Sequence, residues 1–293
     1  MRVAVTGGTG FVGTHAVRAL TAAGHEVVVI ARGTRRRPKR ENVTFVRADV
    51  IGWPGLADAF SQCAAVIHLV AVIREKGGQT FARVNREASE QVAEAARKAG
   101  VQHLIHQSAN GADPDPRYPY LETKWDGEQA AIGSGVPYTV LRPSLIFGPG
   151  DGFFTLIAKL IRLNPVVPIA GDGMALFQPI AIDDVTRCMV LALERGPSDS
   201  VYEIGGPEHM TYDDIVLAVK RAIGVHRFTA HVPVRMMLPL AFLMEHVLPN
   251  PPITVGQLRM LERNNITRLD SVRRAFGFDP QRFADNADYL HDY

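Results

Sequence analysis

The stretch Val5-Thr6-Gly7-Gly8-Thr9-Gly10-Phe11-Val12-Gly13 decides the fold of this chain. Its glycines match both G-x-x-G-x-x-G and G-x-G-x-x-G, directly after a short β-branched run and at the start of a helical pattern, which is the context that gives the motif weight. Such glycines permit positive φ, close backbone approach to a pyrophosphate and tight packing of helix on strand. The helix N-terminus then offers free amides and a positive dipole end to phosphates. We predict that Gly7, Thr9, Gly10, Phe11 and Val12 bind a dinucleotide.

Short apolar runs alternate with helical patterns through the first half of the chain. The expected strands are Val3–Val5, Glu26–Ile30, Val43–Val46, Ala65–Leu69, His103–Gln107 and Tyr138–Leu141. They are compact and lack strict alternation, which is typical of parallel strands buried on both faces. The expected helices between them are Gly13–Ala23, Phe81–Lys98 and Leu121–Ile132. This order predicts an α/β fold, a Rossmann-type doubly wound parallel sheet with right-handed crossovers.

The alternation of strands and helices changes after residue 147, where a glycine-rich loop precedes an expected helix at Phe153–Leu163. A return to the main sheet is expected from a strand at Phe177–Ile182, a helix at Asp183–Glu194 and a strand at Val201–Ile204. The remaining C-terminal part is expected to be mainly helical. We therefore predict a dinucleotide-binding core over 1–147, to which 182–205 returns, and a smaller, mainly helical substrate or partner domain over 148–181 and 206–293.

The composition is that of an ordinary globular chain and argues against several function classes. A formal net charge of +2, from 32 basic and 30 acidic residues, provides no global field for nucleic acid. Cys63 and Cys188 lie far apart and in no metal-ligand spacing, which predicts no metal site and indicates a reducing cytoplasm. The N-terminus lacks the longer apolar run of a signal peptide. The uncharged run Met236–Met244 is too short for a transmembrane span, which needs about 20 residues.

The residue that follows the second expected strand indicates which dinucleotide binds. An NAD site usually carries a carboxylate about 20 residues after the glycines, bonded to the ribose 2′-hydroxyl. Here that strand leads into Arg32, and no carboxylate follows before Glu41. A guanidinium suits a 2′-phosphate, so we predict NADP(H) rather than NAD(H). Arg35–Arg37 can add contacts to the phosphate, whereas a solvated basic loop is the expectation for Lys39 and Arg40.

Three further residues carry candidate catalytic chemistry. Tyr120 and Lys124 form Y-x-x-x-K at the start of a helical pattern, and a spacing of four places both side chains on one face. A neighbouring ammonium favours the phenolate and lowers the pKa of a tyrosine, which suits proton exchange near neutral pH. Ser108 follows the fifth strand, at the edge where ligands of open α/β sheets bind. Its hydroxyl can steady a substrate carbonyl or hydroxyl.

These residues together make the sequence resemble the short-chain dehydrogenase/reductase superfamily along nearly its whole length. It looks most like the extended and atypical branch that includes the NAD(P)H-binding accessory subunit of respiratory complex I and its bacterial relatives. The segments that carry the resemblance are T-G-G-T-G-F-V-G at 6–13, Ala48-Asp49-Val50, Tyr120-Leu121-Glu122-Thr123-Lys124 with Gly127-Glu128, Leu141-Arg142-Pro143-Ser144-Leu145-Ile146-Phe147-Gly148, Asp183-Asp184-Val185 and Tyr202-Glu203-Ile204-Gly205-Gly206-Pro207. The first and fourth are specific to the branch, and the others are supporting.

The resemblance implies a position for each part of the cofactor. It assigns Asp49 and Val50 to the adenine and places Leu69, Val70 and Ala71 along the strand-four edge near the ribose. It assigns Lys124 to the nicotinamide ribose, and Pro143 with its neighbours to the nicotinamide. In active members of the superfamily the tyrosine is the acid/base, and hydride moves to or from the nicotinamide C4.

Two departures from the family pattern keep alternatives open. The strand-four motif reads Leu-Val-Ala at 69–71 where many enzymes carry a glycine-rich version, and Ser108 precedes Tyr120 by only twelve residues. We therefore expect an NADP(H)-dependent oxidoreductase acting on a small or lipophilic substrate, or else a non-catalytic module that holds NADPH and docks on a larger assembly. A nucleotide-sugar epimerase fits less well.

The segment 233–248 is apolar nearly all round. A helix of this kind is expected to be buried, and core packing is the first expectation. A lid over an apolar substrate, a peripheral membrane contact and a protein partner remain open for this segment, and a homodimer remains open for the chain. The expected location is the cytoplasm, with a membrane periphery as the variant that this segment suggests.

Overall fold

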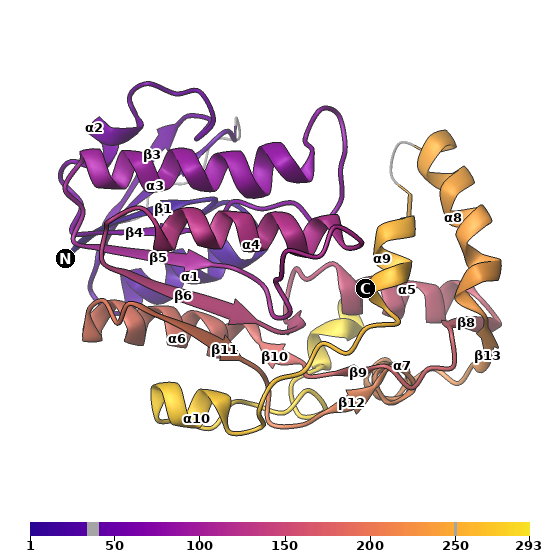
Figure 1. The fold of residues 1–293 in the computed structure, drawn as a ribbon. Coiled ribbons are helices and arrows are strands. Elements are labelled where there is room, and N and C mark those ends of the chain that lie inside the picture. The colour runs from indigo at the N-terminus through magenta and orange to yellow at the C-terminus, as the bar shows by residue number, and fades with distance from the viewer. Residues whose placement is uncertain (34–40, 249–250) are drawn as a thin grey trace. The chain divides into compact units, whose positions relative to one another are not determined.

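The computed structural model describes residues 1–33, 41–248 and 251–293. The chain divides into two compact units, each of two segments. The first unit holds Met1–Pro143 and Ile182–Glu203, and the second holds Ser144–Ala181 and Ile204–Tyr293. Figure 1 shows their elements.

The first unit is built on a seven-stranded parallel sheet with the strand order β11-β6-β5-β4-β1-β2-β3. The strands are β1 (Arg2–Thr6), β2 (Glu26–Ala31), β3 (Val43–Arg47), β4 (Ala65–His68), β5 (His103–Gln107), β6 (Tyr138–Pro143) and β11 (Ser200–Ile204). Because β1 pairs with β2 on one side and β4 on the other, the chain order reverses at β1. Such a reversal marks the crevice in which open α/β sheets bind their ligands. The predicted Rossmann-type sheet is confirmed.

Helices cover both faces of this sheet. Figure 1 shows α3 and α4 side by side over one face, whereas α1 and α6 pack together over the other. The helical elements of this unit are α1 (Phe11–Ala22), α2 (Leu56–Phe60), a π-helical turn η1 (Ala82–Glu87), α3 (Ala88–Lys98), α4 (Pro119–Ile132) and α6 (Ile182–Arg195). The helix expected over Phe81–Lys98 therefore begins with a π-helical segment rather than a regular α-helix.

The second unit combines helices with three two-stranded sheets. Its helices are α5 (Phe153–Leu163), α7 (Tyr212–Ala222), α8 (Val234–Val247), α9 (Val255–Met260), α10 (Ser271–Phe276) and the 3-10 turn η2 (Asp288–Asp292). Its strands are β7 (Ile146–Phe147), β8 (Val166–Ala170), β9 (Leu176–Phe177), β10 (Ile180–Ala181), β12 (Met210–Thr211) and β13 (Phe228–Val232). Three buried phenylalanine rings, Phe147, Phe154 and Phe283, contact one another in its core. No helix in the described part of the chain has the length and apolar character needed to cross a membrane.

The expectation that Phe177–Ile182 is one strand of the main sheet is wrong. This segment splits into β9, which pairs with β12, and β10, which pairs with β7. Pro179 lies between the two strands and lacks the amide that a continuous ladder would need.

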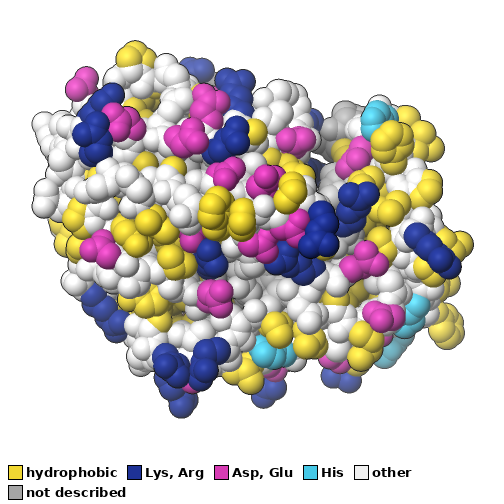
Figure 2. Space-filling view, in the orientation of Figure 1, with side chains coloured by type: hydrophobic (Ala, Val, Ile, Leu, Met, Phe, Trp, Pro, Cys, Tyr) yellow, Lys and Arg dark blue, Asp and Glu magenta, His cyan; other side chains and the backbone are white. Residues whose placement is uncertain are grey.

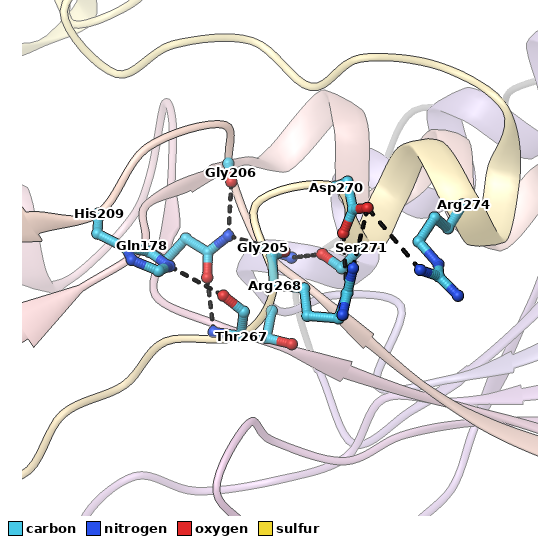
Figure 3. A network of polar contacts seen from close by, with 9 residues as sticks. All are labelled: Gln178, Gly205, Gly206, His209, Thr267, Arg268, Asp270, Ser271 and Arg274. Carbon is cyan, nitrogen blue, oxygen red and sulfur yellow. Dashed lines mark hydrogen bonds and ion pairs between the residues drawn. The ribbon is translucent and has the colours of Figure 1, made fainter.

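The side chain of Gln178, at the break between β9 and β10, is fully buried and hydrogen-bonds two segments of the second unit (Figure 3). Its amide nitrogen donates to the carbonyl of Gly206 at 2.7 Å, and its amide oxygen accepts from the backbone nitrogen of Thr267 at 2.6 Å. A Cβ at Gly205 would collide with this amide group. The absence of a side chain at Gly205 therefore leaves room for the Gln178 amide. Through this amide, Gln178 links the backbone at Gly206 to the backbone at Thr267.

The expectation that the helix at 233–248 packs in the core is also wrong for most of its surface. Only Val234 and Ala241 of α8 are buried. The helix is apolar nearly all round, but only one of its faces packs against the core of the second unit.

Candidate dinucleotide and catalytic site

The glycine turn after β1 packs against the loop that follows β4. Gly7 has a φ of +74°, and a Cβ there would lie 2.9 Å from the backbone carbon of Leu69 and the backbone nitrogen of Val70. A Cβ at Gly13 would collide with the carbonyl oxygen of Gly7. The turn therefore admits no side chain at either position, as the sequence motif requires.

The first turn of α1 is left open to an anion. Its N-cap is Gly10, no side chain caps the helix, and the first turn carries no acidic residue. The helix N-terminus thus presents amides that no side chain of the described residues bonds, together with the positive end of the helix dipole. Thr9, Phe11 and Val12 stay partly exposed around it. This arrangement fits a pyrophosphate.

Arg32 and Asp49, predicted from separate arguments, lie together beyond the ends of β2 and β3. The guanidinium Nη1 lies 3.9 Å from the Asp49 carboxylate, and Nη2 donates to the side-chain oxygen of Gln79 at 3.4 Å. The Arg32 side chain is 55% exposed, so these contacts are weak. It can therefore turn to a ligand at little cost. Val50, in contrast, is buried.

The remaining residues of the basic cluster, Arg35–Arg37, Lys39 and Arg40, fall outside the described residues. Their predicted contacts with a 2′-phosphate, or with solvent, therefore stay predictions.

The loop after β4 holds Leu69, Val70 and Ala71, all at least partly exposed. The side chain of Asn85, which is fully buried in η1, fixes the next residue of this loop. Its oxygen accepts from the backbone nitrogen of Val72 at 2.8 Å, and its nitrogen donates to the Val72 carbonyl at 3.1 Å. Sequence reasoning missed this residue. The available signal was an asparagine, a poor helix former, on an otherwise helical pattern.

Replacing Asn85 by leucine is expected to lower the free energy of unfolding by about 2–4 kcal/mol, because both backbone groups of Val72 lose their partner. Urea unfolding measures the loss, and hydrogen exchange should show a deprotected Val72 amide. Asn85→Asp is the comparison variant for hydrogen exchange alone: it keeps the acceptor for the Val72 amide, although it loses the donor and adds a buried carboxylate. Full protection of Val72 in the leucine variant would contradict the assignment.

Lys124 and Ser108 meet at the carboxyl end of β5. The Lys124 ammonium is buried and donates to the carbonyl of Gln107 at 2.6 Å. Ser108 follows directly, and its amide is anchored on the Leu141 carbonyl of β6 at 2.8 Å. Its buried hydroxyl oxygen has no hydrogen-bond partner within the described part of the chain. An unpaired buried hydroxyl is costly, so it fits a group supplied by a ligand.

Tyr120 lies one helical turn before Lys124 on α4. Its side chain is largely buried, and the ring packs edge-on against Phe81, with ring centroids 5.9 Å apart. Pro143 ends β6 and is buried. Its carbonyl accepts from the Asn110 amide at 2.9 Å, which places it beside the segment that carries Ser108.

The charge states of this pair differ from the sequence-based expectation. Burial raises the pKa of Tyr120 to about 12. Burial lowers the pKa of Lys124 to about 8, although the nearby Glu128 carboxylate opposes this shift. The expected lowering of the tyrosine pKa by Lys124 is wrong for the chain alone, because burial of the phenol sets the direction of the shift and the ammonium donates to the Gln107 carbonyl instead. The Tyr120 phenol is thus protonated at neutral pH and can act as a proton donor.

A buried ion pair ties α4 to β6. The Glu128 carboxylate is 1% exposed and accepts from Nε and Nη2 of Arg142 at 2.8 and 2.7 Å. Arg142 immediately precedes Pro143, and Glu128 lies one turn after Lys124. Two-pronged pairing of this kind fixes geometry as well as charge. It therefore holds the lysine helix in register with the strand that ends at Pro143.

Two buried histidines lie on the neighbouring strands. The rings of His68 and His106 stack with centroids 5.4 Å apart. Burial and the charge of Lys124 lower the pKa of both, that of His68 to about 3. Both are therefore neutral at physiological pH. Residues 1–33, 41–248 and 251–293 contain no group of three or more His, Cys, Asp or Glu side chains that could hold a metal ion.

Comparison with known proteins adds a family and several relatives. The model of the NAD dependent epimerase/dehydratase family matches residues 3–205. The ceramide reductase of Caulobacter vibrioides is 34% identical over 174 residues, which cover 57% of this chain and 53% of that protein. The mitochondrial NADH-ubiquinone oxidoreductase 40 kDa subunit of Neurospora crassa is 24% identical over 300 residues, or 99% of this chain and 77% of that one.

Solved structures share the fold. The dTDP-glucose 4,6-dehydratase DesIV of Streptomyces venezuelae, with NAD and TYD bound, has a TM-score of 0.77 at 21% identity, covering all of this chain and 96% of that one. The chain spans about half the length of the ceramide reductase. The predicted resemblance to the extended dehydrogenase/reductase branch and to the complex I subunit is confirmed.

Proposed function

We propose that this chain, which belongs to the NAD dependent epimerase/dehydratase family, is an oxidoreductase that binds NADP(H) and interconverts a carbonyl and an alcohol on a small or lipophilic substrate. The observation that carries this proposal is the unpaired buried hydroxyl of Ser108 beside the buried ammonium of Lys124, in the unit that also holds the glycine turn. Both groups are costly to bury without a task, and such perturbed groups cluster at functional sites.

In this proposal, different residues of the first unit bind different parts of the dinucleotide. The amides of the α1 N-terminus at Phe11 and Val12 hold the pyrophosphate, while the Gly10 amide donates to the Gly7 carbonyl within the turn. Arg32 pairs with the 2′-phosphate, and Asp49 with Val50 lies against the adenine. The ribose next to the adenine is lined by Leu69, Val70 and Ala71, and the nicotinamide is flanked by Pro143.

The same unit provides the proton chemistry. A bound nicotinamide supplies or accepts the hydride. The Ser108 hydroxyl donates a hydrogen bond to the substrate oxygen, and the Tyr120 phenol delivers the proton that this oxygen needs on reduction. The Lys124 ammonium bonds the nicotinamide ribose and stabilises negative charge that develops at Tyr120. The ceramide reductase relative supports a lipophilic substrate.

The activity is tested with the full chain, NADPH or NADH, and two probe ketones, a long-chain β-keto ester and a short water-soluble one. We expect oxidation of NADPH with the long-chain ester. Native mass spectrometry of the purified chain identifies the nucleotide that it retains. A chain that retains no nucleotide, binds none when it is added and oxidises neither cofactor would contradict both cofactor binding and catalysis.

Replacing Arg32 by alanine is expected to weaken NADPH binding about ten- to a hundredfold, because a two-pronged charged contact with the 2′-phosphate is lost. Binding of NADH should change little, since it lacks that phosphate. Calorimetric titration of both nucleotides measures the effect. Arg18→Ala, on the exposed side of α1, is the matched control. Tighter binding of NADH than of NADPH to the unaltered chain would sink the NADP(H) assignment.

A second candidate is a non-catalytic module that holds NADPH and docks on a larger assembly. The Neurospora relative, a subunit of a larger oxidoreductase by its name, matches 99% of this chain. The Tyr120 pKa of about 12 and the engagement of Lys124 by Gln107 also fit a site that does not turn over. NADPH binding without turnover of any ketone favours this candidate.

A further inference from the structure

Helix α8 of the second unit exposes an apolar face. Its inward side is narrow, with Val234 and Ala241 buried and Met237 and Leu238 partly buried against the core. The outward side carries large hydrophobic residues that are more than half exposed, namely Met236 (67%), Leu240 (59%), Phe242 (57%), Leu243 (57%) and Val247 (68%). Figure 2 shows hydrophobic side chains gathered over this helix. Met236, Leu240, Leu243 and Val247, spaced by four, three and four residues, form one continuous stripe, and Phe242 lies on its flank.

The charges on α8 are arranged around this stripe. Its one carboxylate, Glu245, turns inward and accepts from the backbone nitrogen of Val255 at the start of α9. Arg235 and His246 are exposed, near opposite ends of the helix. His246 donates from Nδ1 to the Phe242 carbonyl, and its ring lies 4.2 Å from the Phe242 ring. The outward face of α8 therefore combines apolar side chains with the Arg235 guanidinium, and the carboxylate of the helix points away from it.

We propose that α8 lies flat on a lipid bilayer that contains anionic headgroups. A helix of fourteen residues is about 21 Å long, so it can lie in the interface plane with Met236, Leu240 and Leu243 below the headgroups. Arg235 then lies at headgroup level, where anionic lipids attract it. This inference is independent of the proposed oxidoreductase, because its residues belong to α8 and its readout needs no nucleotide.

A second copy of the chain is a poorer occupant of this face. An isologous contact through one short helix offers a stripe about 21 Å long and one side chain wide, well below the roughly 800 Å² per partner of a stable dimer. It would also bring the Arg235 guanidinium of each copy to the same contact, with no acid of α8 to offset the charge. A membrane can bury a small apolar stripe, and its anionic headgroups attract the positive charge beside the stripe.

Vesicle flotation of the full chain tests the proposal, with phosphatidylcholine vesicles and vesicles that also contain phosphatidylglycerol. We expect binding to the anionic vesicles that weakens as salt is raised. The double variant Leu240→Glu/Leu243→Glu should bind at least about tenfold more weakly. Arg235→Glu should reduce the preference for anionic vesicles. The matched control is the pair Leu217→Glu and Leu269→Glu, which changes exposed leucines elsewhere in the same unit.

Circular dichroism of each variant checks that the fold is kept, and sedimentation velocity measures the oligomeric state. Equal flotation of the α8 pair and the control pair would overturn the proposal, as would no binding to either vesicle. A dimer that the α8 pair dissociates, without vesicle binding, would also overturn it and assign the stripe to a second copy. Loss of NADPH turnover with vesicle binding retained would leave it standing, since the two readouts are separate.

Discussion

Replacing Tyr120 by phenylalanine is expected to lower turnover with a ketone by about 10²–10⁴-fold, the usual worth of a positioned proton donor. The phenol is protonated at neutral pH, because burial raises its pKa to about 12. In the proposed mechanism its removal leaves the Ser108 hydroxyl to bond the substrate oxygen without a proton donor at position 120. The ring contact with Phe81 survives in the variant, so the fold and the NADPH affinity should stay close to those of the unaltered chain. Stopped-flow measurement of NADPH oxidation and calorimetry separate the two quantities.

The control for this variant is Tyr118→Phe, which changes another tyrosine at the start of the same helix. It should turn over at an unchanged rate. Two results decide against the role given to Tyr120. Unchanged turnover in Tyr120→Phe would remove it as the acid, and a parallel loss of NADPH affinity would make it a binding residue instead.

The first unit was largely predictable because its signals are local. Strands buried on both faces appear as short apolar runs, and the expected strand at His103–Gln107 agrees with β5 residue for residue. The glycines of the turn after β1 indicate close backbone packing, and the structure has it: a side chain at Gly7 or Gly13 would collide with the backbone. Arg32 and Asp49 are predicted by independent arguments and lie together, because parallel strands place their carboxyl ends at one edge.

The errors arose where the outcome depends on contacts distant in sequence. The Phe177–Ile182 pattern is apolar enough for one strand, yet Pro179 breaks it and Gln178 bonds segments around residues 206 and 267. The exposure of α8 could not be predicted from its own residues, because apolarity alone does not say which face the core will cover. The hydrogen-bond partner of the Lys124 side chain could not be predicted from the local sequence either. A spacing of four places it on the same face as Tyr120, but its partner is a carbonyl of β5.

Replacing Lys124 by methionine is expected to make the protein more stable and less active. Burial lowers the pKa of this ammonium from 10.5 to about 8, so the folded chain bears the cost of a buried charge at neutral pH. A methionine of similar length removes that cost but leaves the Gln107 carbonyl without its donor. The net gain in the free energy of unfolding is about 1–2 kcal/mol. Turnover should fall about 10²–10³-fold, as for the loss of one preorganised electrostatic contact.

The sign of the pH dependence identifies the cause. Between pH 8 and 10.5 the unfolded lysine holds a proton that the folded one has lost, so the stability of the unaltered chain rises with pH there. Below pH 8 both states are protonated and the penalty is constant. The advantage of Lys124→Met is therefore full below pH 8 and shrinks as pH rises towards 10.5. Urea unfolding across this range measures it, with Lys98→Met, an exposed lysine, as the control. A stability gain that does not change with pH would show that the ammonium is not the penalised group, and a stability loss would mean that its bond to Gln107 outweighs its burial.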